Sequence, residues 1–308
     1  MINLTIATQA VLEELSRMRS EGVDRIFVQN QTLKELGSLL SANSEIENNY
    51  DPEDGVTQSN RSTQKSDYLA VEEPKPKDVQ SPAKIKNVAP ALPSPPNFEI
   101  PEGNKEKKWE WLRQKVLECE TCKGQLNPSG KVVFGEGNLD AELFLCGEAP
   151  GADEEIAGSP FVGAAGELLM KILNAMGLNR EKVYLGNILN WRPRHDRAYG
   201  NRPPTREEME FCLPYLRAQL EIVQPKVVLA LGKTATDGLI GHDPKRRLNQ
   251  MRGTWHEVSG LPMMVTYHPS YLLHNPSRTS KRKVWEDCIM VMEKLRMPVS
   301  DKQKAFFL

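Results

Sequence analysis

The 308-residue sequence lacks several features that would place a protein in a membrane or outside the cell. No apolar run approaches the roughly 20 residues that a membrane span needs, and the first residues show no signal-peptide pattern. The five cysteines are an odd number in a long chain, so we do not expect a disulfide framework. No internal repeat is found. We therefore expect a cytoplasmic protein that does not associate with membranes.

A large excess of charge is also lacking, because the net charge is only −1. The two parts of the chain differ, however. Residues 1–105 carry 11 Lys and Arg against 16 Asp and Glu, whereas residues 106–308 carry 29 against 25. Basic clusters lie at 244–247 (PKRR) and 276–283 (PSRTSKRK). Since such clusters are usually solvated surface, they indicate nucleic-acid binding only in combination with other features.

The composition divides the chain into four parts. Short helical and strand patterns predict a small N-terminal α/β segment over 1–42, whose role is open. Nine of the 22 prolines lie within 51–105, among Ser, Lys, Glu and Asp. Such a segment buries too little apolar surface to offset the entropy of ordering, so we predict a disordered linker over 43–105. The folded domain is expected over 106–298, followed by a tail over 299–308.

Strand and helix patterns alternate after residue 106. Predicted strands at 141–147, 183–189, 226–232 and 263–268 are separated by helical patterns. This alternation is typical of a three-layer α/β/α fold, in which helices cover both faces of a central, mainly parallel sheet. Ligands of such sheets bind beyond the carboxyl ends of the strands. Three of these ends carry distinctive sequences: CGEAPG, GNILNWRP and TYHPSYLL.

The segment GEAPGADEEIAGSPF (147–161) follows the first strand directly. The strand cannot continue through it, because Pro150 has no amide hydrogen and the glycines favour a tight turn. The bend exposes backbone amides at the end of the strand. Taken alone, the segment fits an ordinary strand-to-helix turn as well as a binding loop.

Three segments together identify a family. GEAPGADEEIAGSPFVGAAGELL, NILNWRP…GNRPPTREEMEFCLPYL and VTYHPSYLL occur in the order and at the spacing of the motifs of family 4 uracil-DNA glycosylases. The resemblance extends from about Cys119 to Leu295. It implies a DNA repair enzyme that flips uracil out of DNA and hydrolyses its N-glycosidic bond, leaving an abasic site. Uracil-containing DNA is therefore the expected partner of a monomeric protein.

The resemblance also implies which residues bind the base. Phe161 matches the aromatic residue that stacks on uracil, and Asn187 matches the amide that reads N3–H and O4. His268 corresponds to the histidine that donates toward uracil O2 as negative charge develops on the departing base. Backbone amides near Ala149 and Gly151 are expected to receive the base.

Acidic and amide residues complete the implied catalytic set. Glu148 and Glu154 match the acidic positions that place or activate the water nucleophile, and the division of roles between them stays open. Glu154 has the alternative role of excluding the methyl group of thymine. Asn201 matches a further polar position of the active site.

Contacts with DNA are expected from the segment that follows the histidine. Ser270 and Tyr271 resemble part of the loop that fills the gap left by the flipped base, with simple helix capping as the alternative. Arg278, Lys281 and Arg282 are candidates for phosphate contacts, which contribute affinity but no base choice.

Cysteine spacing differs from the family pattern at one position. Members usually hold a [4Fe-4S] cluster with four cysteines, and Cys119, Cys122 and Cys212 match three of them. Trp191, which cannot ligate iron, occupies the fourth position. The alternatives are a ligand from His195 or from outside the chain, a zinc ion, or no metal at all.

Two segments leave further alternatives open. The loop RPRHDRAYGNRPP is about five residues longer than is usual in the family and carries His195. A related branch captures the deoxyribose covalently through a histidine in an inserted loop, although this insertion does not match that branch's basic loop. A non-catalytic DNA-binding module is a third alternative. The tail DKQKAFFL resembles peptides that bind sliding clamps, and packing of the tail on its own domain is the competing prediction.

Overall fold

The computed structural model describes residues 91–194 and 201–308. The N-terminal segment predicted over 1–42, most of the predicted linker and His195 lie outside the described residues. Within these described ranges, no helix has both the length and the apolar character needed to cross a membrane.

One sheet forms the centre of the described part of the chain, with six strands in the order β1-β3-β2-β4-β6-β5. The inner strands are parallel: β3 (Tyr184–Asn187), β2 (Leu143–Gly147), β4 (Val227–Leu231) and β6 (Leu261–Thr266). The edge strands β1 (Glu136–Gly137) and β5 (Trp255–Val258) are antiparallel to their neighbours. All residues of β2, β3 and β4 are buried, because both faces of the sheet are covered.

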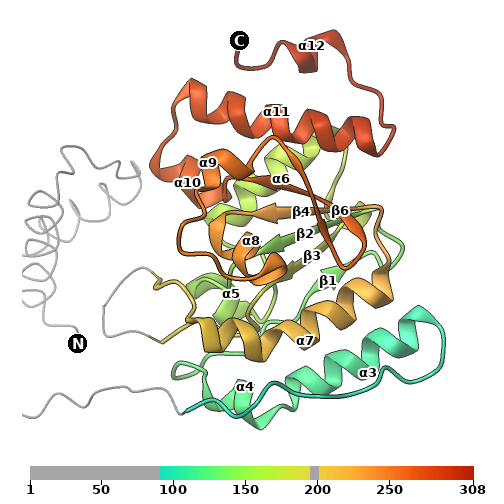
Figure 1. The fold of residues 1–308 in the computed structure, drawn as a ribbon, viewed down its shortest axis with the longest axis vertical. Coiled ribbons are helices and arrows are strands. Elements are labelled where there is room, and N and C mark those ends of the chain that lie inside the picture. Colours follow the sequence, from blue (N-terminus) through green and yellow to red (C-terminus); the bar gives the residue numbers. More distant parts are fainter. Residues whose placement is uncertain (1–90, 195–200) are drawn as a thin grey trace, which may run out of the picture. The chain divides into compact units, whose positions relative to one another are not determined.

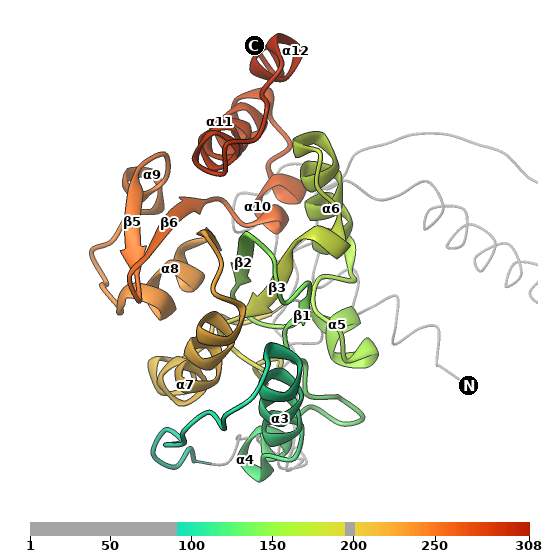
Figure 2. The ribbon, with the colours of Figure 1, turned by 90° about the vertical axis from the view of Figure 1, so that its right-hand side faces the viewer.

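Helices cover the two faces and produce the predicted three layers (Figures 1 and 2). One apolar cluster joins the sheet to α6 (Ala164–Met176), α10 (Pro269–His274) and α11 (Arg278–Lys294). A second cluster, on the other face, joins it to α3 (Lys105–Leu117), α7 (Arg206–Val223) and α8 (Lys233–Ile240). The shorter helices are α4 (Glu120–Gly124), α5 (Ala152–Ala157), η1 (Arg180–Lys182), α9 (Leu248–Met251) and α12 (Asp301–Lys304). The prediction of a three-layer α/β/α fold is confirmed.

Apolar residues of the proline-rich segment before residue 105 contact the core of the sheet domain. Phe98 stacks on Tyr215 with ring centroids 5.5 Å apart and meets Trp111 edge-on at 5.8 Å. Leu92 and Ile100 pack against the same core. These residues of the predicted linker therefore pack on the core, while the predicted domain bounds stay predictions. A few apolar residues in a proline-rich segment are enough to anchor it once helices α3 and α7 provide a surface.

The C-terminal tail lies on α6 and α11. Its Gln303 donates from Nε2 to the carbonyl of Ala175 at 2.8 Å, and the indole N–H of Trp285 donates to the carbonyl of Gln303 at 2.5 Å. Phe306 packs on Trp285 with ring centroids 5.2 Å apart. These contacts agree with packing of the tail on its own domain, which was one of the two predictions for this segment.

Candidate active site

A cavity of about 590 Å³ lies beyond the carboxyl ends of the parallel strands. The loops after β2, β3, β4 and β6 all contribute to it, as the topology of a parallel sheet requires. Ten residues predicted from the sequence line this cavity: Glu148, Ala149, Gly151, Glu154, Phe161, Asn187, Asn201, His268, Ser270 and Tyr271.

Gly147, the last residue of β2, lets two of these side chains approach each other. A β-carbon at this position would lie 2.3 Å from Oδ1 of Asn187 and 2.7 Å from Cζ of Phe161. Phe161 itself has a φ of 55°, in the left-handed region, and is buried. Arg180 holds this turn by donating to the carbonyls of Pro160 at 2.6 Å and Phe161 at 3.2 Å. The aromatic ring is thus fixed beside the strand end by backbone contacts rather than by free packing.

The carboxylate of Glu154 is occupied by backbone amides. Its Oε2 accepts from the amide of Gly151 at 3.0 Å, and its Oε1 accepts from those of Val162 at 3.0 Å and Gly163 at 2.8 Å. The side chain is buried and also completes the capping of α5. Glu154 therefore connects the bend after β2 to the turn that carries Phe161.

Glu148 differs from Glu154 in its surroundings. Burial raises the pKa of the Glu148 carboxyl, and a hydrogen bond with the Thr234 hydroxyl partly opposes that rise in pKa. Thr234 stands in α8, just after β4. A carboxylate whose pKa is raised by burial is a stronger base than a solvated one, which suits it to accept a proton.

Two asparagines reach the cavity from the β3 side. Asn187 is the last residue of β3 and only 8% exposed. Asn201 accepts a hydrogen bond at its Oδ1 from Nε of Arg192 at 2.7 Å. Arg192 also lies 3.5 Å from the buried carboxylate of Glu155, so the position of Asn201 depends on an ion pair behind the cavity wall.

His268 caps α10 with its imidazole ring. Its Nδ1 accepts from the backbone amide of Ser270 at 3.2 Å and lies 2.7 Å from the Ser270 hydroxyl. Because Nδ1 is an acceptor, the proton of the neutral ring is on Nε2. Burial lowers the pKa of His268 to about 4, so the ring is neutral at pH 7. The Phe161 and His268 ring centroids are 6.4 Å apart.

Several residues of the cavity were missed by the sequence analysis. They include Gly232, Lys233 and Thr234 after β4, together with Tyr267 and His274. Gly232 has a φ of 94°, and a β-carbon there would approach Cβ of His268 to 3.2 Å. The sequence did contain a signal for this loop, since the predicted strand KVVLALG ends in Gly232. A parallel strand with a glycine at its end is the same pattern that marked the loop after β2.

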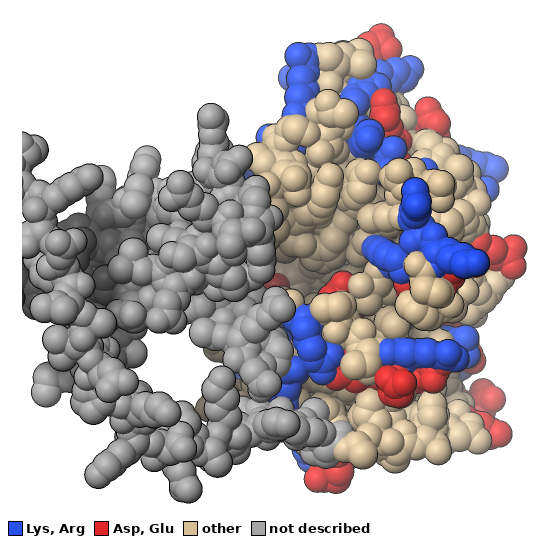
Figure 3. Space-filling view, turned by 60° about the vertical axis from the view of Figure 1, so that its left-hand side comes forward, with Lys and Arg blue, Asp and Glu red and all other residues tan. Residues whose placement is uncertain are grey.

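The predicted basic DNA contacts lie apart from the cavity, on α11. Arg282 donates to Glu286 at 2.8 Å and to the carbonyls of Lys304 at 2.7 Å and Phe306 at 2.9 Å, so its guanidinium group anchors the tail. Arg278 and Lys281 stand in the first turns of the same helix. Figure 3 shows one face of the molecule on which Lys and Arg side chains are spread around a largely uncharged area, with some Asp and Glu between them.

The three predicted metal-binding cysteines lie near one another. The Cys122 amide is 3.5 Å from the sulfur of Cys119, and contacts with Cys122 and with the Tyr215 hydroxyl lower the pKa of Cys119 to about 5. Burial raises the pKa of Cys212, and charge on Cys119 raises it further. Among the described residues, no group of three or more His, Cys, Asp or Glu side chains is placed to hold a single metal ion.

Trp191 takes part in the same core. It is completely buried, with its ring centroid 6.0 Å from that of Phe211, the residue before Cys212. Within the described chain, its indole Nε1 is the one buried side-chain nitrogen or oxygen without a hydrogen-bond partner. An unpaired buried N–H lowers the free energy of unfolding by about 1–3 kcal/mol. A hydrogen-bond acceptor that reached the Trp191 indole would therefore be bound favourably.

Comparison with known proteins agrees with this geometry. The family model of the uracil DNA glycosylase superfamily matches residues 134–289, so the chain belongs to that superfamily. A type-4 uracil-DNA glycosylase of Thermotoga maritima is 40% identical over 186 residues, which are 59% of this chain and 92% of that protein. One from Saccharolobus solfataricus is 37% identical over 57% of this chain and 81% of its own length. Within the superfamily, the chain is a member of the type-4 uracil-DNA glycosylases.

Proposed function

We propose that this enzyme repairs DNA by flipping a uracil nucleotide into the cavity and hydrolysing its N-glycosidic bond. The observation that carries the proposal is the convergence of four residues on one cavity from the carboxyl ends of three strands: Glu148 and Phe161 after β2, Asn187 at the end of β3 and His268 after β6. A base inside a duplex cannot reach such a cavity unless its nucleotide leaves the stack.

Recognition of the base rests on shape and on one amide. The ring of Phe161 offers a stacking surface, and the Asn187 side chain accepts from N3–H and donates to O4 of uracil. Cytosine presents the reverse pattern at these two positions, which leaves buried polar groups unpaired and weakens its binding strongly. Backbone amides near Ala149 receive the remaining edge of the base, whereas the amide of Gly151 is already bonded to Glu154 and fixes the bend beside them.

Bond cleavage is assisted by the neutral His268 ring. Its Nε2–H donates to uracil O2, where negative charge grows as the base departs. One preorganised donor of this kind is worth about 3 kcal/mol. The Ser270 amide fixes the tautomer, so no proton has to be rearranged during the reaction.

Water is the nucleophile that completes the hydrolysis. Glu148 accepts its proton and stabilises the positive charge on the sugar, as its raised pKa and its place at the end of β2 favour. Glu154 acts as a positioning residue, because three backbone amides already occupy its carboxylate. Asn201, held by its hydrogen bond from Arg192, contributes a polar side chain to the wall of the cavity.

The activity is tested with uracil-containing oligonucleotides and matched controls, followed by alkaline cleavage of the abasic product. Release of free uracil over many enzyme equivalents is expected, and it separates turnover from covalent capture through His195. Asn187→Ala and Glu148→Gln are each expected to lower the excision rate at least about tenfold without changing the unfolding midpoint. A correctly folded wild-type protein that leaves uracil in place would instead support the non-catalytic DNA-binding module.

We assign the cysteines to an iron–sulfur cluster with an incomplete protein ligand set. Cys119, Cys122 and Cys212 are the thiols that would hold it, and the unpaired Trp191 N–H supplies a donor rather than a ligand. When bound, the cluster links the start of the domain to α7. Zinc, or no metal, is the outcome that would replace this assignment.

For the C-terminal tail (299–308), the proposed function is binding to a sliding clamp. Phe307 and Leu308 are 42% and 67% exposed, which suits apolar anchors for a partner. Gln303 would first have to leave Ala175. Deleting residues 303–308 should abolish binding to a clamp in a pull-down, while uracil is still excised from short oligonucleotides.

A monomeric state and a cytoplasmic location stay predictions.

A further inference from the structure

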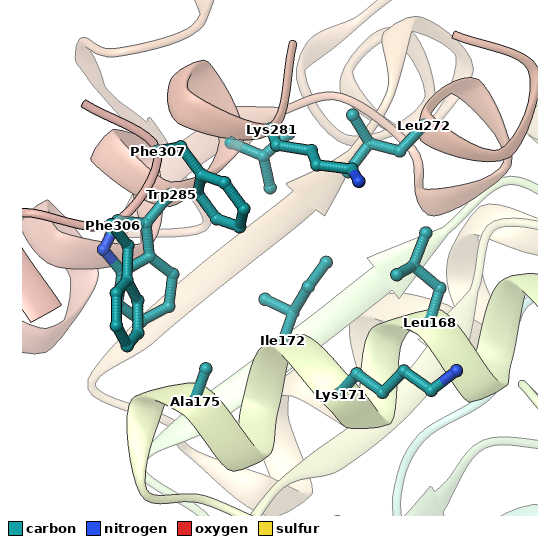
Figure 4. Close-up of a pocket in the computed structure, with 10 residues that line it drawn as sticks. Leu168, Lys171, Ile172, Ala175, Leu272, Lys281, Trp285, Phe306 and Phe307 are labelled. Atoms are coloured by element: carbon teal, nitrogen blue, oxygen red, sulfur yellow. The ribbon is translucent and has the colours of Figure 1, made fainter. Parts of the chain in front are cut away.

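A second pocket, of about 350 Å³, lies between α6, α10 and α11, on the other side of α10 from the cavity described above. Figure 4 shows the rings of Trp285, Phe306 and Phe307 at one end of this pocket. Ile172 and Ala175 of α6 form its floor. This volume falls within the range of ligand-binding pockets, and its lining is almost entirely apolar.

Two lysines supply the charge of this pocket. The amino groups of Lys171 and Lys281 lie toward the end opposite the aromatic rings, where Leu168 and Leu272 are found (Figure 4). Neither lysine has a hydrogen-bond or ion-pair partner among the described residues. An apolar pocket with aromatic walls and two unpaired cations is complementary to a flat, apolar group that carries a negative charge.

Phe307 is held in this wall at a conformational cost. Its φ is 62°, in the left-handed region, which bulky residues rarely adopt. Its ring meets Phe306 nearly edge-on, at 6.3 Å and 63°, and 42% of the residue stays exposed. A ring that contacts a neighbouring ring at its edge and stays partly exposed is suited to stacking on a partner.

The pocket lies close to the proposed path of DNA. Ala165 of α6 lines the uracil cavity, whereas Leu168 to Ala175 of the same helix line the second pocket. Ten residues of helix span about 15 Å, which corresponds to about four base steps of one DNA strand. The two pockets are separated by α10, which carries Tyr271 on one side and Leu272 on the other.

We propose that this aromatic pocket binds an unpaired base of the DNA strand a few nucleotides from the flipped uracil, with Lys171 and Lys281 on the adjoining phosphates. This proposal rests on the proposed function, since it assumes that DNA occupies the neighbouring cavity. The lining has almost no group that could read a base edge, so the pocket accepts any base by stacking, as single-strand binding sites do. The enzyme thereby prefers uracil near single-stranded DNA.

The test compares three uracil-containing substrates: a blunt duplex, the same duplex with an unpaired thymidine tail next to the lesion, and one whose tail has phosphates and sugars but no bases. Each tail is placed on the 5′ side in one set and on the 3′ side in another. Affinity is measured by fluorescence anisotropy with uracil-free versions, and excision is measured in single turnovers. We expect the thymidine tail, on one side, to raise affinity about fivefold or more, and the base-free tail to raise it much less.

Variants of the pocket residues test whether the pocket causes the higher affinity for tailed DNA. Phe307→Ala and Lys171→Gln should each reduce the ratio of tailed to blunt affinity by several fold, whereas Phe307→Trp should retain it. Lys182→Gln removes one charge at the amino end of β3 and should leave the ratio unchanged. Equal affinity of the wild type for tailed and blunt DNA would overturn the proposal, as would an unchanged ratio in Phe307→Ala or an equal gain from the base-free tail. Blunt-duplex excision reports on the proposed function independently, because the tail plays no part in it.

Discussion

The backbone amide of Ser270 donates to Nδ1 of His268 at 3.2 Å, and this contact places the proton of the half-buried neutral ring on Nε2. The ring is neutral because burial lowers its pKa to about 4. A neutral donor avoids placing a full charge in a buried site. It also leaves the hydrogen-bonding direction independent of pH over the range in which most enzymes work.

The first prediction concerns this ring. Nitrogen-15 NMR of the imidazole should show the Nε2–H form from pH 8 down to about pH 5. Since the folded-state pKa lies below the ordinary value of 6.5, the stability contributed by His268 is complete above pH 6.5 and is lost as the pH falls toward 4. His268→Ala should lower excision at least about tenfold and remove this part of the acid sensitivity. An imidazolium spectrum at pH 6 would contradict the assignment.

The second prediction concerns the glycine at the end of β2. Gly147→Ala places a methyl group against Asn187 and Phe161, both of which belong to the proposed uracil site. We expect excision to fall at least about tenfold, mostly through weaker substrate binding, because the side chains must move to make room. Gly124→Ala is the matched control, since a β-carbon there has nothing within 4 Å. Equal excision rates in both variants would show that Phe161 and Asn187 are not held in their functional positions by Gly147.

The third prediction concerns a buried ion pair behind the cavity. Arg252 donates to both carboxylate oxygens of Asp287, at 3.1 and 2.8 Å, and its guanidinium lies 5.7 Å from the ring centroid of Tyr267. Arg252→Met should lower the free energy of unfolding by about 3 kcal/mol, because the completely buried Asp287 loses its ion-pair partner and keeps only the hydrogen bond from the Thr266 hydroxyl.

The pH dependence of that loss has a definite sign. Burial raises the pKa of Asp287 to about 6, so the proton is held more strongly in the folded state and the stability due to this group decreases as the pH rises from 3.8 through 6. Losing Arg252 raises this pKa further, and the variant should therefore lose more stability at pH 8 than at pH 5. Urea denaturation at the two pH values measures the difference. A loss of stability that does not change with pH would mean that the carboxyl group is not the cause.

The fourth prediction concerns the cysteines. Anaerobically purified protein should be brown and contain iron and sulfide in stoichiometric amounts. Cys212→Ser should lower both contents and the unfolding temperature, since the proposed cluster would join this thiol on α7 to the segment of Cys119 and Cys122. Trp191→Cys supplies the missing fourth thiol and should make the cluster more resistant to oxygen. Colourless protein with one zinc ion, or with no metal, would reject the iron–sulfur assignment.

The sequence by itself determined the layers and the edge at which the site lies. Continuous apolar runs such as LFLC and VVLAL, bounded by turn residues and alternating with helical patterns, are typical of strands covered on both faces, and parallel strands bring their carboxyl ends together. This pattern predicted that the segments CGEAPG, GNILNWRP and TYHPSYLL meet at one edge, and the resemblance to family 4 uracil-DNA glycosylases then implied Glu148, Asn187 and His268 as the site residues within them. Short-range patterns are sufficient for the layers because the alternation of apolar strands with amphipathic helices is written along the chain.

Only the tertiary structure decided what each polar group is bonded to. Glu154 and Glu148 have the same side chain and lie six residues apart after β2, yet three amides occupy the carboxylate of Glu154 and burial raises the pKa of Glu148. Arg282 was expected on DNA, but it holds the tail through carbonyls more than 20 residues away. Thr234 went unnoticed because its partner Glu148 comes from another strand. A hydrogen bond depends on positions within a few tenths of an ångström, and packing of distant segments sets those positions.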